Sequence, residues 1–167
     1  MLQVAIQADG EWDSSRFSEQ LVRRAAEAAI AESAFPRLAT SPRSVELSVR
    51  LTSNDEVRAL NAKWRGKDRA TNVLSFPLAE ISDLSDTNIA EAELLLGDIV
   101  LAHGVCGAEA ADKGVSVEDH AAHLLVHGTL HLLGYDHHDD EQAADMEARE
   151  SRALARLGIA NPYEKAA

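Results

Sequence analysis

The sequence predicts a single α+β domain that spans residues 1–167, with strands in the middle of the chain and helices around them. Three observations lead to this fold class. A chain of this length fits one domain and can bury a core of its own. Segments with strand-like alternation and segments with helical periodicity both occur. No repeat, linker or low-complexity stretch divides the chain.

The first half of the chain is expected to form two strands, each followed by a helix. Residues 45–51 are apolar at every second position, which is typical of a half-buried strand. Ser53 and Glu56 have the spacing of a capping box and predict the start of a helix. The predicted elements are a strand at residues 2–8, a helix capped by Ser14 or Ser15 that runs to about Ala34, a strand at residues 45–51 and a helix from the capping box to about Trp64.

The second half predicts two more strands and then three helices. Pro77 indicates that the strand at residues 73–77 lies at a sheet edge or ends there, and Gly97 interrupts the strand at residues 94–102. The acidic segment 79–93 between these strands is expected to be a loop or hairpin excursion. The predicted helices are a short one near residues 106–113, one that opens at residues 116–119, and a last one over residues 139–157 with Gly158 just after its end.

Three histidines in the second half have the spacing of a catalytic metal site. His127 and His131 are four residues apart, so on a helix they lie about 40° apart on one face. Gly134 can end that helix with a positive φ and turn the chain back to bring His137 in as a third ligand. Three histidines with an open fourth position are typical of catalytic zinc sites. The sequence therefore predicts one Zn²⁺, or another divalent transition metal, at His127, His131 and His137.

The neighbouring polar residues are interpreted differently. Helical projection places an apolar side of this helix against the sheet and its histidine side toward a cleft. His120 and His123 are expected to line the cleft or lie on the surface, although His123 could also pair with His127. His138 could compete with His137, and Asp136 is expected to orient a ligand or cap the following helix.

One position separates this pattern from the metzincin peptidases. In those enzymes a glutamate follows the first histidine and acts as the general base. Here Gly128 occupies that position, so peptide hydrolysis is disfavoured.

Composition narrows the function classes. The net charge of −12 argues against broad non-specific attraction to nucleic acid. Between residues 58 and 69, however, five basic residues accompany a single acidic one, Asp68.

The single cysteine, Cys106, excludes an internal disulfide and is expected to be a buried apolar residue in a reducing cytoplasm. With no long apolar run and no signal-peptide pattern, we expect a cytoplasmic protein without membrane association.

Residues 127–137 closely resemble the motif of the YbeY family of bacterial endoribonucleases and rRNA maturation factors. Further stretches with that family's pattern bring the resemblance to roughly residues 45–157, with gaps at the acidic segment. Asn72 departs from it, because many members have aspartate there. The further stretches are residues 60–65, 71–77, 96–100 and 139–150.

The resemblance implies a mostly parallel or mixed sheet packed with helices, a zinc ion on the three histidines and cleavage of single-stranded RNA. It implies roles in 16S rRNA 3′-end maturation and ribosome quality control. Arg65 then lies in the active cleft, where a guanidinium can neutralise charge on a phosphate in the transition state. Ser75 and Asp98 are candidate supporting residues. The sequence leaves open whether water or the ribose 2′-hydroxyl attacks.

The expected partners are single-stranded rRNA precursor and a protein that presents it, either a small-subunit ribosomal protein or a ribosome-associated GTPase; no DNA substrate is expected. Two alternatives remain at this point. One is a non-catalytic ribosome-assembly factor stabilised by its metal, with His123 or Asp136 as a fourth ligand. The other is a zinc peptidase that recruits its base from elsewhere in the chain.

Overall fold

The computed structural model describes residues 1–85 and 93–164. Over these residues the strands form a mixed sheet in the order β1-β2-β4-β3. Neighbours β1, β2 and β4 run parallel, whereas β3 runs antiparallel to β4 at the edge, as Pro77 predicted. The strands are β1 (Leu2–Ala8), β2 (Val45–Thr52), β3 (Val73–Pro77) and β4 (Leu94–Ala102).

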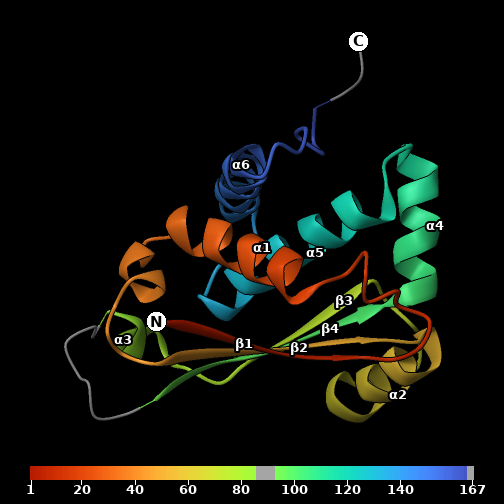
Figure 1. Cartoon of the computed structure of the whole chain (residues 1–167), viewed down its shortest axis with the longest axis horizontal. Helices are drawn as coiled ribbons and strands as arrows, with labels where there is room; N and C mark the ends of the chain where they lie inside the picture. Colours follow the sequence, from red (N-terminus) through yellow and green to blue (C-terminus); the bar gives the residue numbers. More distant parts are fainter. Residues whose placement is uncertain (86–92, 165–167) are drawn as a thin grey trace.

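The helices cover the two faces of the sheet unequally (Figure 1). On one face lie α1, α5 and α6, with α4 beside them, while α2 covers only one end of the other face (Figure 1). The bounds are α1 (Glu19–Ala31), η1 (Pro36–Ala39), α2 (Asn54–Arg65), α3 (Ile81–Leu84), α4 (His103–Lys113), α5 (Val117–Leu132) and α6 (Asp140–Arg156). Among the residues described, no helix has the length and apolar character needed to cross a membrane.

The main core lies between the sheet and the helices on its fuller face. Every second side chain of β2, from Val45 to Leu51, is buried there, as the alternation predicted. Helix α5 runs through the middle of this layer and packs on α1, α4, α6 and the strands β3 and β4. Because neighbours surround it, α5 is buried on nearly all sides rather than on one face.

Most helix starts follow the predicted caps. The hydroxyl of Ser53 accepts a hydrogen bond from the backbone N–H of Glu56, and Ser116 caps α5 in the same way. The prediction for the first helix was wrong, because Ser18 is its cap and it ends at Ala31. Asp13 accepts hydrogen bonds from the N–H and hydroxyl of Ser15, which holds that segment in a turn. This turn lets the adjoining Trp12 and Phe17 enter the core.

The middle of the chain agrees with the predicted pattern in outline. The register between β2 and β4 shifts at Gly97, whose φ is +143°. Helix α4 begins at His103, three residues earlier than the predicted 106–113, and buries Cys106 as expected. The predicted acidic excursion contains the short helix α3; its residues 86–92 lie outside the described part of the chain.

The burial of α5 leads to a stability prediction. Leu125 of α5 is 2% exposed, whereas Leu95 of β4 is 45% exposed. We expect Leu125→Ala to lower the free energy of unfolding by about 2–5 kcal/mol, because it removes buried methyl groups and leaves a cavity. Leu95→Ala makes the same chemical change at the surface and should cost much less. Urea unfolding followed by circular dichroism measures both, and equal losses would contradict the assigned burial.

Candidate metal centre

The C-terminal end of α5 and the turn after it bring the three predicted histidines together. His127 and His131 lie on adjacent turns of α5, and His137 follows the turn. One ring nitrogen from each lies within 4.8 Å of the others. Among residues 1–85 and 93–164, no fourth histidine, cysteine or carboxylate joins this group, so His123 and Asp136 do not complete a four-ligand site.

The hydrogen bonds at the far side of two rings fix which nitrogen faces the group. Nδ1 of His131 lies 2.8 Å from the backbone oxygen of Tyr135, and Nδ1 of His127 lies 2.5 Å from Oε1 of Glu150. A carbonyl and an ionised carboxylate only accept, so each Nδ1 carries the proton and donates. Burial, together with the neighbouring His127, lowers the pKa of His131 to about 4, so its ring is neutral at pH 7.

The donor set that results fits a metal ion. With Nδ1 of both rings donating, the Nε2 atoms of His127 and His131 face the group as possible ligand atoms and lie 3.0 Å apart. A tetrahedral zinc ion with bonds of about 2.0–2.1 Å to two imidazoles holds their nitrogens roughly 3.3 Å apart. Two imidazole nitrogens at this separation are well placed to share a cation.

Glu150 of α6 is the buried carboxylate behind the group. Its side chain is fully enclosed, and burial opposes its ionisation. Contacts with His123 and His127 and a 2.5 Å hydrogen bond from the Tyr163 hydroxyl outweigh burial and lower the pKa of Glu150 to about 2. The carboxylate is therefore charged at neutral pH. A carboxylate that accepts from a metal-binding histidine fixes the ring orientation and raises its basicity.

The turn after α5 brings in His137 as predicted. Gly134 has φ +95°, a conformation that favours glycine, and it packs against Ile81 of α3. The carboxylate of Asp136 accepts from the backbone N–H of His137 and lies 2.8 Å from Nε2 of His138. His138 is thereby directed to Asp136 rather than to the group, and Asp136 orients the turn. The cap of α6 is the next acidic residue, Asp139.

Two other histidines of α5 lie where the sequence did not predict them. His120 and His123 were expected in a cleft or on the surface, yet they are only 3% and 7% exposed. His120 bonds to Glu109 of α4 at 2.8 Å, and His123 contacts the hydroxyl of Tyr163 at 3.2 Å. Helix α4 and the segment after α6 cover this end of the histidine side. Only the C-terminal end of α5 stays partly open.

The packing around Gly128 gives a structural reason why no glutamate, the general base of the metzincin peptidases, occupies this position. A Cβ atom at this position would lie 3.0 Å from Ile99 of β4 and 3.1 Å from the hydroxyl of Ser75 of β3. Position 128 therefore faces the sheet at close range and leaves no room for a glutamate side chain. This geometry removes the metzincin arrangement as a description of the site.

A hollow of about 440 Å³ lies directly beside the histidines. His131 forms part of its wall, together with residues around the end of β3 and the start of α3, including Glu80, a carboxylate.

Arg65 lies at the end of α2, and its guanidinium donates to the backbone oxygen of Ser75 at 3.2 Å. The Ser75 hydroxyl is buried against Gly128, and in the described part of the chain it has no hydrogen-bond partner. Ser75 thus links the arginine to the turn of α5 that carries His127.

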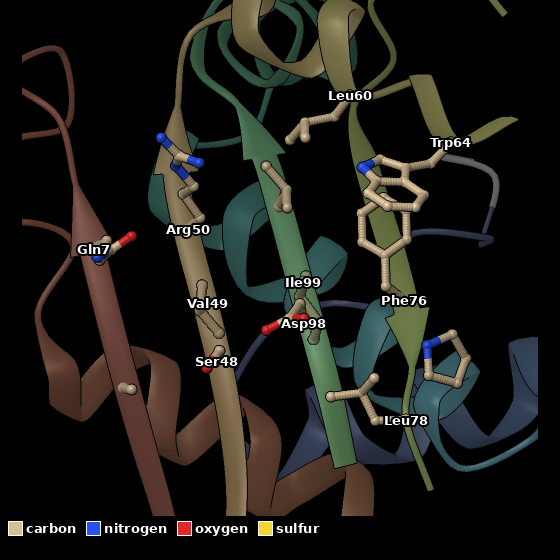
Figure 2. A pocket seen from close by; sticks show the side chains of 13 residues that line it. Gln7, Ser48, Val49, Arg50, Leu60, Trp64, Phe76, Leu78, Asp98 and Ile99 are labelled. Carbon is tan, nitrogen blue, oxygen red and sulfur yellow. The ribbon is translucent and has the colours of Figure 1, made fainter. Parts of the chain in front are cut away.

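The other candidate residues are placed less directly. Asp98 lies outside the histidine group and lines a groove over β2 and β4 (Figure 2). Asn72 donates to Glu109, the residue that also holds His120. Sequence reasoning missed Glu150 and Tyr163. The one available signal was the position of Glu150 one turn from Met146 and Leu154 on the buried face of α6.

The close approach of α5 to the sheet can be tested by substitution at Gly128. We expect Gly128→Ala to lower the free energy of unfolding by about 1–3 kcal/mol, because the added methyl overpacks a fixed interface. Gly107→Ala is the matched control, since Gly107 is also helical and an added Cβ there meets nothing within 4 Å. That change should raise stability by roughly 0.5–1 kcal/mol. A Gly128→Ala variant as stable as the control in thermal unfolding would refute the close contact.

The role of Glu150 can be tested through metal affinity. We expect Glu150→Gln to weaken Zn²⁺ binding by about 10- to 100-fold, because the histidine loses an ionised acceptor at Nδ1. Competition with a chromophoric chelator measures the dissociation constant. Glu147→Gln, an exposed change one turn earlier on α6, should leave that constant unaltered. Equal affinities in the two variants would show that Glu150 does not support the metal.

Comparison with known proteins places the chain in a family. The family profile described as Endoribonuclease YbeY matches residues 7–158. An endoribonuclease YbeY from Rhizorhabdus wittichii is 49% identical over 165 residues, which cover 98% of this chain and 97% of the relative. One from Sphingopyxis alaskensis is 50% identical and covers 98% of both chains.

A solved structure shows the same fold. The solution structure of a Thermotoga maritima protein covers 98% of this chain and all of its own, with a TM-score of 0.55 at 24% identity. The α+β architecture built around a mixed sheet is thus shared with a distant protein. Together with the profile that matches residues 7–158 and the two relatives of nearly equal length, this shows that the chain belongs to the YbeY endoribonuclease family.

Proposed function

We propose that this protein is a metal-dependent endoribonuclease that cuts single-stranded RNA. The observation that carries the proposal is the three-histidine group, which offers three imidazole nitrogens, no fourth protein ligand among the residues described, and an adjoining hollow. Such a donor set is typical of catalytic rather than structural zinc. Family membership supports RNA as the substrate, since the relatives are named endoribonucleases.

The histidines, Glu150 and Arg65 have separate roles in the proposed reaction. His127, His131 and His137 would hold a zinc ion, which supplies a Lewis acid and an acidified water when bound. Glu150 keeps the proton on Nδ1 of His127, so that Nε2 stays available as a donor. Arg65 would pair with the phosphate through its planar guanidinium and neutralise charge that develops in the transition state. No carboxylate lies within ion-pair distance of Arg65 in the described part of the chain, so its charge is available.

The biological context is proposed on the same basis. The family resemblance supports action on the 3′ end of 16S rRNA and in ribosome quality control, in the cytoplasm. A chain of net charge −12 attracts bare RNA weakly. A small-subunit ribosomal protein or a ribosome-associated GTPase that presents the RNA would offset this weakness. DNA is not expected as a substrate.

Two other functions are less well supported. A peptidase would need a base near the first histidine, and the close contact of Gly128 with the sheet leaves none at the metzincin position. A non-catalytic assembly factor would use its metal to hold the fold. The apolar core around α5 is extensive without a metal, which favours a catalytic use of the three histidines.

Two substitutions test the proposed roles. We expect His131→Ala to lose both zinc and cleavage of single-stranded RNA from the 3′ end of precursor 16S rRNA. Arg65→Ala should retain zinc and the fold while cleavage slows by about 10²–10³-fold, the usual cost of removing a donor that stabilises transition-state charge. Metal analysis and a gel-based cleavage assay measure the two properties on the same preparations.

The controls separate nuclease from contaminant and from assembly factor. Arg24→Ala removes an exposed arginine from α1, on the opposite side of the sheet from α2, and should cleave like the parent protein. A chelator should stop cleavage without unfolding the chain, and added Zn²⁺ should restore it. If all variants cleave equally, the activity is a contaminant. Unfolding by the chelator would instead support the assembly-factor function.

A further inference from the structure

The face of the sheet opposite the histidine helix carries a groove that the proposed chemistry does not use (Figure 2). It has a volume of about 720 Å³, within the range of ligand-binding clefts. Strands β2 and β4 form the floor, and Trp64 and Phe76 lie along one side (Figure 2). Helix α2 covers only one end of this sheet face (Figure 1).

The groove exposes aromatic and apolar side chains to solvent. Trp64 is 63% exposed at the end of α2, and Leu78 is similarly exposed just after β3. Ser48 and Asp98 add hydrogen-bonding groups on the floor (Figure 2). An exposed aromatic beside a few polar groups is the arrangement with which proteins stack single-stranded bases and contact their edges.

The charges beside the groove favour a polyanion over an apolar peptide. Lys63 places its ammonium 5.1 Å from the centre of the Trp64 ring, and Arg65 and Lys67 follow on the same segment. None of these three cations lies within ion-pair distance of a carboxylate in residues 1–85 and 93–164. Arg50, by contrast, is paired with Glu56 and does not add free charge. In an acidic protein, a local group of unpaired cations at an aromatic platform matches the phosphates of a nucleic-acid strand.

The groove and the hollow beside the candidate metal centre share a wall residue on the edge strand β3. Pro77, at the end of the edge strand β3, lines both the groove and the hollow that contains His131. Arg65 bonds to Ser75, two residues before Pro77 on the same strand. An extended strand whose phosphate lies at the histidines can therefore pass over the edge of β3 and reach the platform of Trp64.

We propose that this groove binds the bases of single-stranded RNA next to the cleaved phosphodiester, with Trp64 as the stacking platform. The proposal rests on the proposed nuclease function and adds a binding subsite to it. It explains a preference for single strands, because bases paired in a duplex are not free to stack on a protein aromatic. It also assigns Lys63 and Lys67 to phosphate binding, whereas Arg65 keeps its proposed role in the chemistry.

Direct binding of an uncleavable RNA tests the subsite. The probe is a fluorescein-labelled 2′-O-methyl oligouridylate of about eight nucleotides, within the usual site size for such proteins. We expect Trp64→Ala to weaken its binding by about 5- to 150-fold, as expected from loss of a base–aromatic stack. Trp64→Phe should retain most of the affinity because it keeps an aromatic face. Leu95→Ala, an exposed apolar change outside the groove, should bind like the parent protein.

Intrinsic fluorescence supplies a second readout. The chain has two tryptophans, and Trp12 is 2% exposed in the core, so a base can reach only Trp64. We expect the unlabelled probe to quench the parent protein but not Trp64→Phe, and a duplex of the same length to quench neither. Absence of quenching, or a Trp64→Ala variant that binds like Leu95→Ala, overturns the subsite and leaves the groove to a protein partner.

The outcomes separate this subsite from the nuclease itself. If the parent protein cleaves RNA and Trp64→Ala binds the probe unchanged, the groove proposal fails and the nuclease stands. If the probe binds and quenches but no RNA is cleaved, the nuclease fails and the RNA groove stands. In a cleavage assay, Trp64→Ala should raise KM and leave kcat nearly unchanged, because the platform does not touch the reacting atoms.

Discussion

The ionised carboxylate of Glu150 is the interaction on which the organisation of this protein depends. It lies fully enclosed on α6, yet its pKa is held low by His123 and His127 of α5 and by Tyr163. An unpaired buried charge costs several kcal/mol, so these partners must all be in place when the chain folds. One carboxylate thus fixes α6 and the C-terminal segment against α5. It also supplies negative charge beside the three-histidine group, which suits this group to a divalent cation.

A second constraint is the central place of α5. A helix that packs on three other helices and the sheet needs small side chains where contacts are closest, and Gly128 meets this need at Ser75 and Ile99. The same contact aligns the three-histidine group with the edge of β3. Because His127 precedes Gly128 directly, packing on one side of the helix sets the position of the chemistry on the other. The glycine in the motif is therefore a structural requirement as well as a difference from the peptidases.

Local signals in the sequence were sufficient for most of the fold but not for the surroundings of the site. Strict alternation predicted β2, and the Ser53 and Ser116 caps predicted two helix starts, because these features depend only on neighbours along the chain. The cap of α1 was misplaced because Asp13 holds the preceding serines in a turn. The burial of His120 and the partnership of Glu150 with His127 depend on which helices pack around α5. Glu150 is one of many acidic residues on α6, so only the tertiary structure distinguishes it.

The edge strand β3 reconciles an acidic protein with a polyanionic substrate. Strand β3 lies between the helix-covered face of the sheet, where the histidines lie, and the face with Trp64. The guanidinium of Arg65 donates to the backbone oxygen of Ser75 on this strand. In the described part of the chain Arg58 pairs with Asp68, whereas Lys63, Arg65, Lys67 and Arg69 have no carboxylate within ion-pair distance. The carboxylates elsewhere disfavour RNA on the rest of the surface. In the proposed mode of binding, repulsion over most of the molecule and attraction at one edge would limit binding to strands that pass over the edge of β3. On this proposal the net charge would restrict the orientation of the RNA, and the local cations would determine where the strand is held.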